Sequence, residues 1–206
     1  AYSVDGLEAD DVIGTISEKA KETGHLVYIL TGDRDMLQLV NGKTKVLAPF
    51  KGISEMTLYD EVKVKEKYGV TPAEFVELKA LMGDSSDNYP GVSGVGPKTA
   101  TTLIKEYQSV ENIYKNIDKI KAKNPKLGEK LSMGKENAFL AHQLATILTN
   151  ADFEYNFADC SVKKLDAEGL KKAMETYDFK TLPRRVDEVF KNGKIKKIEV
   201  TQMKLL

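Results

Sequence analysis

A short apolar run from His25 to Leu30 constrains the fold of this chain more than any other feature. The run is rich in β-branched and aromatic residues and lies between Gly24 and Gly32, so it predicts a buried strand of the parallel type. Residues 8–22 carry apolar side chains at helical spacing and predict a helix. A helix that leads into a buried strand is typical of an α/β layer.

The segments that follow extend this α/β portion to about residue 82. They predict two short strands, at residues 45–48 and 53–59, and three helices, at residues 35–39, 60–68 and 71–82. We expect Pro49 to end the first of these strands. Thr71 is expected to cap the last helix, and Glu74 completes a capping box.

Beyond residue 82 the pattern becomes helical. Residues 83–97 hold four glycines and two prolines and predict a dense loop. Helices are predicted over most of residues 98–148, a short extended segment at 151–160, and two further helices at 166–177 and 183–191. The expected domains are therefore an α/β portion (1–82), an all-helical portion (83–190) and a loosely held basic tail or linker (191–206).

Composition excludes two classes of protein. No apolar run approaches the ~20 residues that a membrane-spanning helix needs. Cys160 is the single cysteine, so a fold held by internal disulfides is excluded. The first residues lack the order of a signal peptide, and we expect a protein of the reducing cytoplasm.

The net charge is zero, with 31 basic and 31 acidic residues, but the charges are unevenly distributed. Residues 1–40 hold eight acids and three bases, a net −5, whereas residues 91–135 hold nine lysines and four acids, a net +5. The acids are suited to holding cations and the lysines to contacting a polyanion. Two solvated faces are the alternative.

Seven carboxylates form three clusters, each next to a predicted element: Glu8, Asp10 and Asp11; Asp33 and Asp35; Asp84 and Asp87. The helix dipole and turn propensity explain any one cluster by itself. However, ligands of an open α/β sheet bind outside the carboxyl ends of its strands, and the first two clusters belong to that rim. Seven carboxylates there would raise one another's pKa values unless cations neutralised them.

Oxygen ligands without His or Cys favour Mg²⁺ or Mn²⁺ over zinc, and the spacing of an EF-hand is absent. Two such ions roughly 4 Å apart would hold the attacking and leaving oxygens of a phosphodiester. The sequence therefore predicts a two-ion site.

A glycine-rich loop precedes the helix that begins near residue 98. Its glycines allow tight turns, and Pro97 suits the first position of a helix whose free N–H groups can bind an anion. The loop is not a Walker A motif, because Pro97 separates Gly96 from Lys98. We predict that it contacts a nucleic-acid phosphate without reading the base sequence, and a plain helix–helix turn is the alternative. The candidate DNA-binding residues are Gly91, Gly94, Val95, Gly96, Lys98 and Thr99.

Four motifs carry a specific resemblance: Glu8–Asp11, Thr31–Asp35, Gly83–Asn88 and Gly91–Gly96. In this order and spacing they resemble the 5′→3′ exonuclease domain of bacterial DNA polymerase I, of the flap endonuclease family. The resemblance implies a partial Rossmann-like (PIN-like) nuclease core followed by a helix-hairpin-helix subdomain. It also implies hydrolysis of DNA in 5′ flaps and in nicked or gapped duplexes, during replication and repair.

The resemblance assigns roles to the carboxylates. It makes Glu8, Asp10 and Asp11 ligands of a first metal ion, places Asp33 between the two ions, and makes Asp35, Asp84 and Asp87 the group at the second. Within this set Asp10, Asp11, Asp33 and Asp35 form the catalytic group, with a metal-bound hydroxide as the nucleophile. The family pattern also allows a K⁺ ion at backbone carbonyls of the hairpin.

The family pattern carries about 80–100 residues ahead of the motif at Glu8, which is a large part of a domain of ordinary size. That segment supplies a strand, two further aspartates and an arch with basic residues. We therefore expect this chain to be a fragment, or to be completed by a second chain, and to have little or no activity alone. A fused polymerase domain is a further expected partner, and the chain is otherwise expected to be a monomer. The alternative function is a non-catalytic helix-hairpin-helix DNA-binding module.

Overall fold

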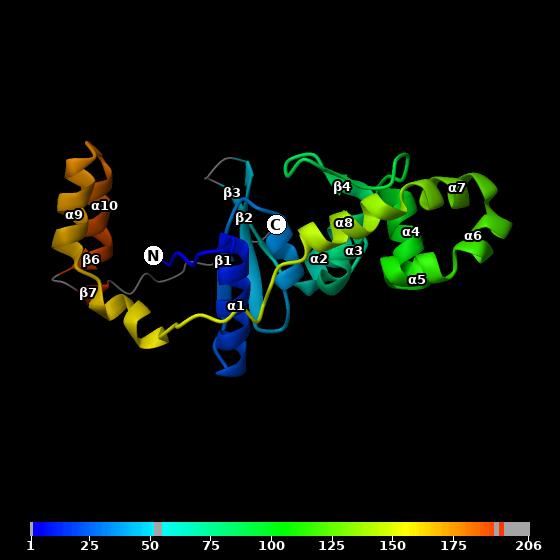
Figure 1. The fold of residues 1–206 in the computed structure, drawn as a ribbon. Helices are drawn as coiled ribbons and strands as arrows, with labels where there is room; N and C mark the ends of the chain where they lie inside the picture. Colours follow the sequence, from blue (N-terminus) through cyan, green and yellow to red (C-terminus); the bar gives the residue numbers. More distant parts are fainter. Residues whose placement is uncertain (1, 52–54, 192–193, 196–206) are drawn as a thin grey trace. The chain divides into compact units, whose positions relative to one another are not determined.

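The computed structural model describes residues 2–51, 55–191 and 194–195. The chain divides into two compact units, residues 1–153 and 154–206 (Figure 1). The predicted boundary at residues 82 and 83 falls inside the first unit, and the position of that boundary stays a prediction.

The first part of unit 1 alternates helices and strands. Its elements are α1 (Ala9–Glu22), β1 (Val27–Leu30), the 3₁₀ helix η1 (Asp35–Leu39), β2 (Thr44–Lys51), β3 (Glu55–Tyr59), α2 (Glu61–Tyr68), the 3₁₀ helix η2 (Pro72–Glu74) and α3 (Phe75–Met82). The strands form one sheet in the order β1-β2-β3, with β1 parallel to β2 and β2 antiparallel to β3. The predicted capping box is confirmed, since the Thr71 N–H donates to Glu74 Oε2 at 2.8 Å.

Strand β1 differs from the prediction in its burial. Its parallel pairing is confirmed, with Val27 opposite Thr44. However, Tyr28 is 58% exposed and Leu30 is 71% exposed, and only Ile29 is buried. Successive side chains of a strand point to opposite faces, and β1 is an edge strand of the described sheet. The apolar run is therefore buried on one face and not on both.

Strand β2 continues past the proline that was expected to end it. Pro49 lies opposite Met56, and the register shifts between Pro49 and Lys51. Proline cannot donate a ladder hydrogen bond, but an irregularity of the ladder tolerates it. The start of the predicted strand 53–59 lies partly outside the described residues.

The remainder of unit 1 is helical apart from one hairpin. Its elements are β4 (Gly83–Asp84), β5 (Tyr89–Pro90), α4 (Pro97–Tyr107), α5 (Val110–Lys115), α6 (Ile117–Lys123), α7 (Pro125–Met133) and α8 (Lys135–Ala145). The segment 83–97, predicted as a loop, thus contains a short antiparallel pair, β4 with β5.

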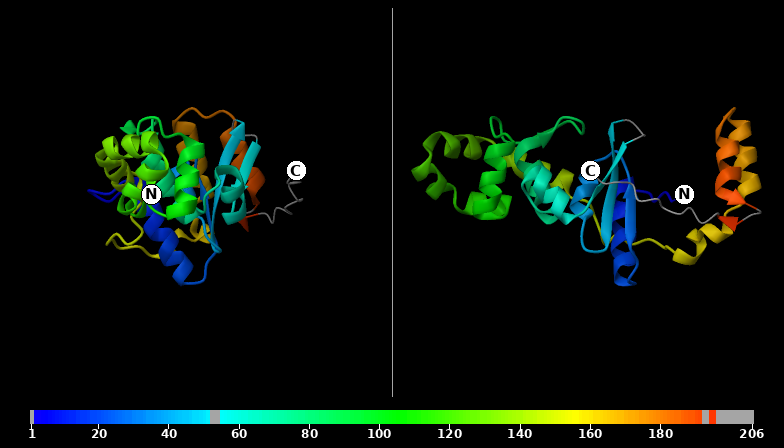
Figure 2. Two further views of the ribbon diagram at one scale, coloured as in Figure 1. Left: turned by 90° about the vertical axis from the view of Figure 1, so that its right-hand side faces the viewer. Right: turned by 180° about the vertical axis from the view of Figure 1, so that it is seen from behind.

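One hydrophobic core joins the sheet to the helices of unit 1. It includes Met36 of η1, Val46 of β2, Leu81 of α3 and Ile104 of α4, all at most 1% exposed. Figure 2 shows α3 and α8 beside the sheet, and α8 packs against α3. Because the sheet and the helices bury their apolar side chains together, they form a single unit.

Unit 2 contains short helices. These are η3 (Phe157–Cys160), η4 (Val162–Lys164), α9 (Ala167–Thr176) and α10 (Leu182–Val189), followed by the pair β6 (Phe190–Lys191) and β7 (Lys194–Ile195). The predicted extended segment 151–160 is wrong at its end, because the Asn156 side chain accepts a hydrogen bond from Ala158 and starts a 3₁₀ turn. Both predicted helices are confirmed, and most of the tail lies outside the described residues. None of the helices in the described part of the chain is long and apolar enough to cross a bilayer.

Candidate metal centre

The first acidic cluster lies at the start of α1. Glu8 is the N-cap residue, and its backbone N–H donates to Asp11 Oδ2 at 3.2 Å. The other oxygen of Asp11 accepts a hydrogen bond at 2.9 Å from the Leu148 N–H. Asp11 therefore fixes the start of α1 and holds the segment after α8 against it.

The second cluster follows β1. The backbone N–H of Asp33 donates to Thr31 Oγ1, and Asp33 Oδ1 accepts a hydrogen bond from the Asp35 N–H, both at 2.9 Å. Asp35 begins η1 and is buried. These local bonds fix the turn that brings both carboxylates to the end of the strand.

The third cluster belongs to the β4–β5 hairpin. Gly83 has a φ of +73°, and a Cβ atom on it would lie 2.3 Å from the Gly91 nitrogen. Only glycine allows the two chain segments to approach this closely. The hairpin places Asp84 next to α3, and Asp84 Oδ1 accepts hydrogen bonds from the backbone N–H and the hydroxyl of Ser86.

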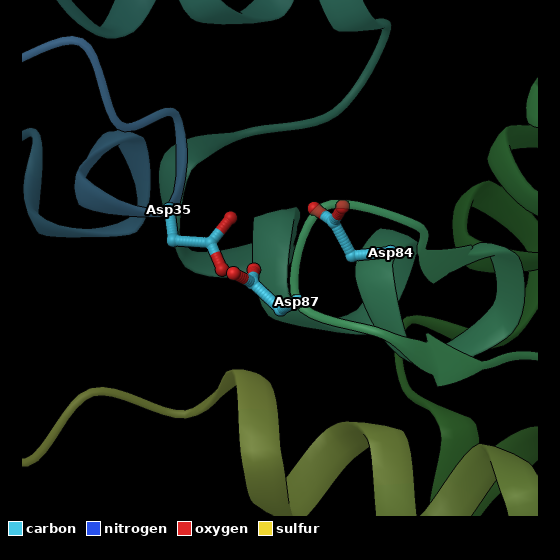
Figure 3. Close-up of side chains that lie close together, drawn as sticks. All are labelled: Asp35, Asp84 and Asp87. Carbon is cyan, nitrogen blue, oxygen red and sulfur yellow. The ribbon is translucent and has the colours of Figure 1, made fainter.

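The structure brings the three clusters together. A pocket of about 430 Å³ is lined by six of the seven predicted metal-site residues: Glu8, Asp10, Asp11, Asp33, Asp35 and Asp87. In addition, Asp35, Asp84 and Asp87 each offer a carboxylate oxygen within 4.8 Å of the others. Figure 3 shows these three side chains, which approach one another from η1 and the β4–β5 hairpin. Asp35 and Asp87 belong to both sets, so all seven carboxylates form one connected group.

The electrostatics of the group follow from this crowding. Burial, followed by repulsion from Asp33 and Asp35, raises the pKa of Asp10 to about 6. Burial also raises the pKa of Asp35, although Lys79 partly offsets the effect. Burial alone would raise the pKa of Asp84 as well, but hydrogen bonds from Lys79 and Ser86 lower it to about 2. A cation near Asp10 and Asp35 would relieve the repulsion.

Sequence reasoning missed two residues of this centre. Lys79 of α3 forms ion pairs with Asp35 and Asp84. Tyr89 of β5 lines the acidic pocket, and its buried hydroxyl has no hydrogen-bond partner among the described residues. Burial and the nearby Asp35 raise the pKa of Tyr89 to about 12, so the hydroxyl stays protonated. Lys79 lies on the helix that leads into the third cluster, but this position does not indicate which acids it contacts, and nothing in the sequence marks Tyr89.

The glycine-rich loop leads into α4. Gly94 has a φ of +74°, and its carbonyl oxygen accepts a hydrogen bond from Lys130 Nζ at 3.3 Å. Gly96 is the N-cap of α4 and Pro97 occupies its first turn. Lys98 is exposed in that turn, beside N–H groups that α4 itself cannot satisfy.

The six predicted DNA-binding residues do not share one environment. Gly94, Gly96 and Lys98 are exposed and Thr99 is half-buried. Val95 is buried and belongs to the core, and Gly91 packs against Gly83. None of the six, all of them described, lines the acidic pocket.

The donor set suits a hard divalent cation. The three clusters supply only carboxylate oxygens; Asp35 is buried, and Asp10 is repelled by its neighbours. Mg²⁺ and Mn²⁺ prefer such ligands, whereas zinc in proteins is usually held with nitrogen or sulfur ligands. The residues present therefore fit a divalent cation.

Comparison with curated proteins gives DNA polymerases I as relatives. The chain is 41% identical to DNA polymerase I of Bacillus subtilis over 187 residues, which is 91% of this chain and 21% of that protein. It is 45% identical to the Lactococcus lactis enzyme over 180 residues, 86% of this chain and 20% of that protein. The chain thus spans about a fifth of the length of these relatives.

Solved structures similar to this chain include nucleases of bacteriophage T5. A mutant of the bacteriophage T5 5′-exonuclease matches with a TM-score of 0.59 and 27% identity, covering 70% of this chain and 57% of that one. A T5 flap endonuclease described as a complex with DNA and metal ions matches with a TM-score of 0.59 and 26% identity, covering 70% and 51%. The catalytic core of Rad2, at 20% identity and a TM-score of 0.51, shares the fold and covers 89% of this chain and 61% of that one.

Family models divide the matched region in two. The 5′-3′ exonuclease N-terminal resolvase-like domain matches residues 1–69, and the 5′-3′ exonuclease C-terminal SAM fold matches residues 70–168. The predicted α/β core followed by a helical subdomain is confirmed, and the chain belongs to the 5′-3′ exonuclease family.

Proposed function

We propose that this chain hydrolyses DNA phosphodiesters at 5′ ends and 5′ flaps, with divalent cations held by its acidic group. The observation that carries the proposal is the convergence of seven carboxylates from three separated segments on one connected group. The T5 nuclease with DNA and metal ions, a structural relative, supports both the substrate and the cations.

Asp35, Asp84 and Asp87 would hold one Mg²⁺ or Mn²⁺ ion, and Asp10 and Asp33, with Glu8 and Asp11, would hold the other. Bound divalent ions supply a water of lowered pKa and neutralise the charge that develops on the phosphate. The chain's own groups prepare this site. Lys79 forms an ion pair with the buried Asp35 and partly offsets the effect of burial on the pKa of this carboxyl, and the protonated Tyr89 hydroxyl can donate to an oxygen in the pocket.

The loop before α4 would hold the duplex. The free N–H groups at the start of α4 and the exposed Lys98 are suited to one backbone phosphate, with Gly94, Gly96 and Thr99 beside them. The Gly94 carbonyl already accepts a hydrogen bond from an ammonium group, so this loop presents oxygen to a cation. A K⁺ ion held by the loop carbonyls is part of the proposal.

Single-turnover cleavage of a 5′-flap duplex, with protein in excess, tests the function. Because the expected rate is low, we score the reaction by its dependence on Mg²⁺ and on Asp35. Product should form in Mg²⁺, not in EDTA, and not with Asp35→Asn. Asp118→Asn is the matched control, since Asp118 is an exposed acid of α6.

The outcomes separate the candidate functions. Salt-dependent binding of the duplex without Mg²⁺-dependent cleavage would identify a DNA-binding module instead. Absence of both cleavage and duplex affinity would reject both functions.

A further inference from the structure

Lys79 lies inside the carboxylate group. It projects from the last turn of α3, and its side chain is only 15% exposed. Its Nζ forms ion pairs with Asp35 Oδ1 and Asp84 Oδ2. These two residues, with Asp87, are the three whose carboxylate oxygens lie within 4.8 Å of one another. The ammonium group is therefore bound by two of the three carboxylates that a cation would use.

The free oxygens of the group are few. Asp84 Oδ1 accepts two hydrogen bonds from Ser86, one of them from the backbone N–H at 2.7 Å, and Asp84 Oδ2 faces Lys79. Among the described residues, none forms a hydrogen bond of ordinary geometry with the buried Asp35 Oδ1, which faces the same ammonium. The ammonium of Lys79 already occupies the oxygens of Asp35 and Asp84 that a divalent cation would bind. Because two cations at the same oxygens repel each other, the divalent cation and Lys79 compete for these oxygens.

The charges are consistent with an exchange. The formal charges of three carboxylates and one ammonium sum to −2, which one divalent ion would balance. Lys79 donates a hydrogen bond to Asp84 and forms ion pairs with both Asp35 and Asp84, so it occupies these carboxylates as a cation.

The structure also provides a place for the displaced side chain. Lys79 lines a cavity of about 650 Å³ whose lining includes Ser85 and Ser86 as well as Asp33, Asp84 and Asp87, so a displaced ammonium would stay near acidic groups. The lysine stem has four flexible carbons, so the ammonium can turn into this cavity without movement of α3.

We propose that Lys79 is a built-in counter-ion of the metal centre, which a divalent cation must displace from Asp35 and Asp84, so that Lys79 weakens metal binding. The inference rests on the metal-dependent function proposed above. It differs from a purely organising role, in which Lys79 would hold the two carboxylates in position and its loss would weaken metal binding.

Metal affinity tests the inference directly. We would titrate the 206-residue chain and Lys79→Met with Mn²⁺, followed by electron paramagnetic resonance, and with Mg²⁺ by calorimetry, at pH 8. Lys79→Met should bind about tenfold more tightly, the factor that corresponds to about 1.4 kcal/mol of lost competition. Lys79→Arg keeps a cation and should bind as weakly as the unchanged chain. Lys123→Met, which removes an exposed ion pair with Glu106, should change nothing.

Thermal unfolding gives a second readout. In EDTA, Lys79→Met should melt at a lower temperature than the unchanged chain, because three carboxylates lose their counter-ion. Saturating Mg²⁺ should then raise its melting temperature by more than it raises that of the unchanged chain. A second substitution, Asp87→Asn, should abolish the gain in metal affinity, since Asp87 is the third carboxylate of the group.

Each outcome of the metal titrations either supports or overturns the inference. Equal or weaker metal binding by Lys79→Met, with the unchanged chain still binding metal, overturns this inference and leaves the proposed function intact. Binding by Lys79→Met alone supports the inference in its strongest form. If neither protein binds Mn²⁺ or Mg²⁺, the metal centre and this inference both fail.

Discussion

The crowding of carboxylates predicts that one substitution in the acidic pocket will stabilise the metal-free chain. Asp10→Asn removes a charge that is disfavoured first by burial and then by repulsion from Asp33 and Asp35. We therefore expect a higher free energy of unfolding for this variant in EDTA, together with weaker metal binding. A gain in stability from losing a functional group is common where sites concentrate like charges.

The magnitude follows from the pKa. The shift of Asp10 from 3.8 to about 6 corresponds to roughly 3 kcal/mol at 1.36 kcal/mol per unit, and solvent screening reduces it to about 1 kcal/mol. Because the folded chain holds this proton more tightly than the unfolded chain, the free energy of unfolding falls as pH rises from about 4 to about 6. The penalty is complete above that range, so the gain of Asp10→Asn should be about 1 kcal/mol at pH 8 and smaller at pH 5.

Urea denaturation in EDTA, followed by far-ultraviolet circular dichroism at pH 5 and pH 8, measures the gain. Glu61→Gln is the matched control, because Glu61 is also an acid in the first turn of a helix but lies outside the carboxylate group. If Asp10→Asn is no more stable than the control at pH 8, or if its gain is the same at both pH values, the repulsion argument is wrong.

Three further predictions concern the hairpin, a histidine and the loop before α4. Gly91→Ala should lower stability by about 2 kcal/mol in urea denaturation, since its Cβ would lie 2.3 Å from a backbone nitrogen, whereas Gly96→Ala, with open space around it, should not. A hydrogen bond to a carboxylate of α3 raises the pKa of His142, so its stabilisation is present at acidic pH and lost as pH rises through that pKa. His142→Gln should therefore lower the free energy of unfolding, measured by urea denaturation, by about 0.5 kcal/mol at pH 6 and by less at pH 8.5. Lys98→Met should weaken duplex binding and reduce the slope of log affinity against log salt by about 1, and Lys115→Met on α5 should not.

Local signals in the sequence predicted most elements of the fold. The capping box at Thr71 and the proline at the start of α4 each mark a helix start, because they satisfy or tolerate the N–H groups that a helix leaves free. Where an element depends on what packs over it, the same reasoning was less successful. Nothing within the run from His25 to Leu30 shows that β1 is an edge strand of the described sheet with one face exposed.

The metal centre shows the same division between local and distant information. The three acidic clusters were predictable because each follows an element whose end has a known place in an α/β sheet. The contribution of Lys79 to the centre was not predictable from the sequence. The helix α3 also directs neighbouring side chains into the core, and the amphipathic pattern of α3 does not indicate which acids Lys79 contacts. The ion pair between Lys79 and Asp84 requires the close approach of Gly83 and Gly91, which places Asp84 beside α3. The ion pairs of Lys79 thus depend on the packing of a hairpin that lies more than 40 residues after Asp35 in the sequence. Only the folded structure shows that this hairpin and Asp35 lie close together.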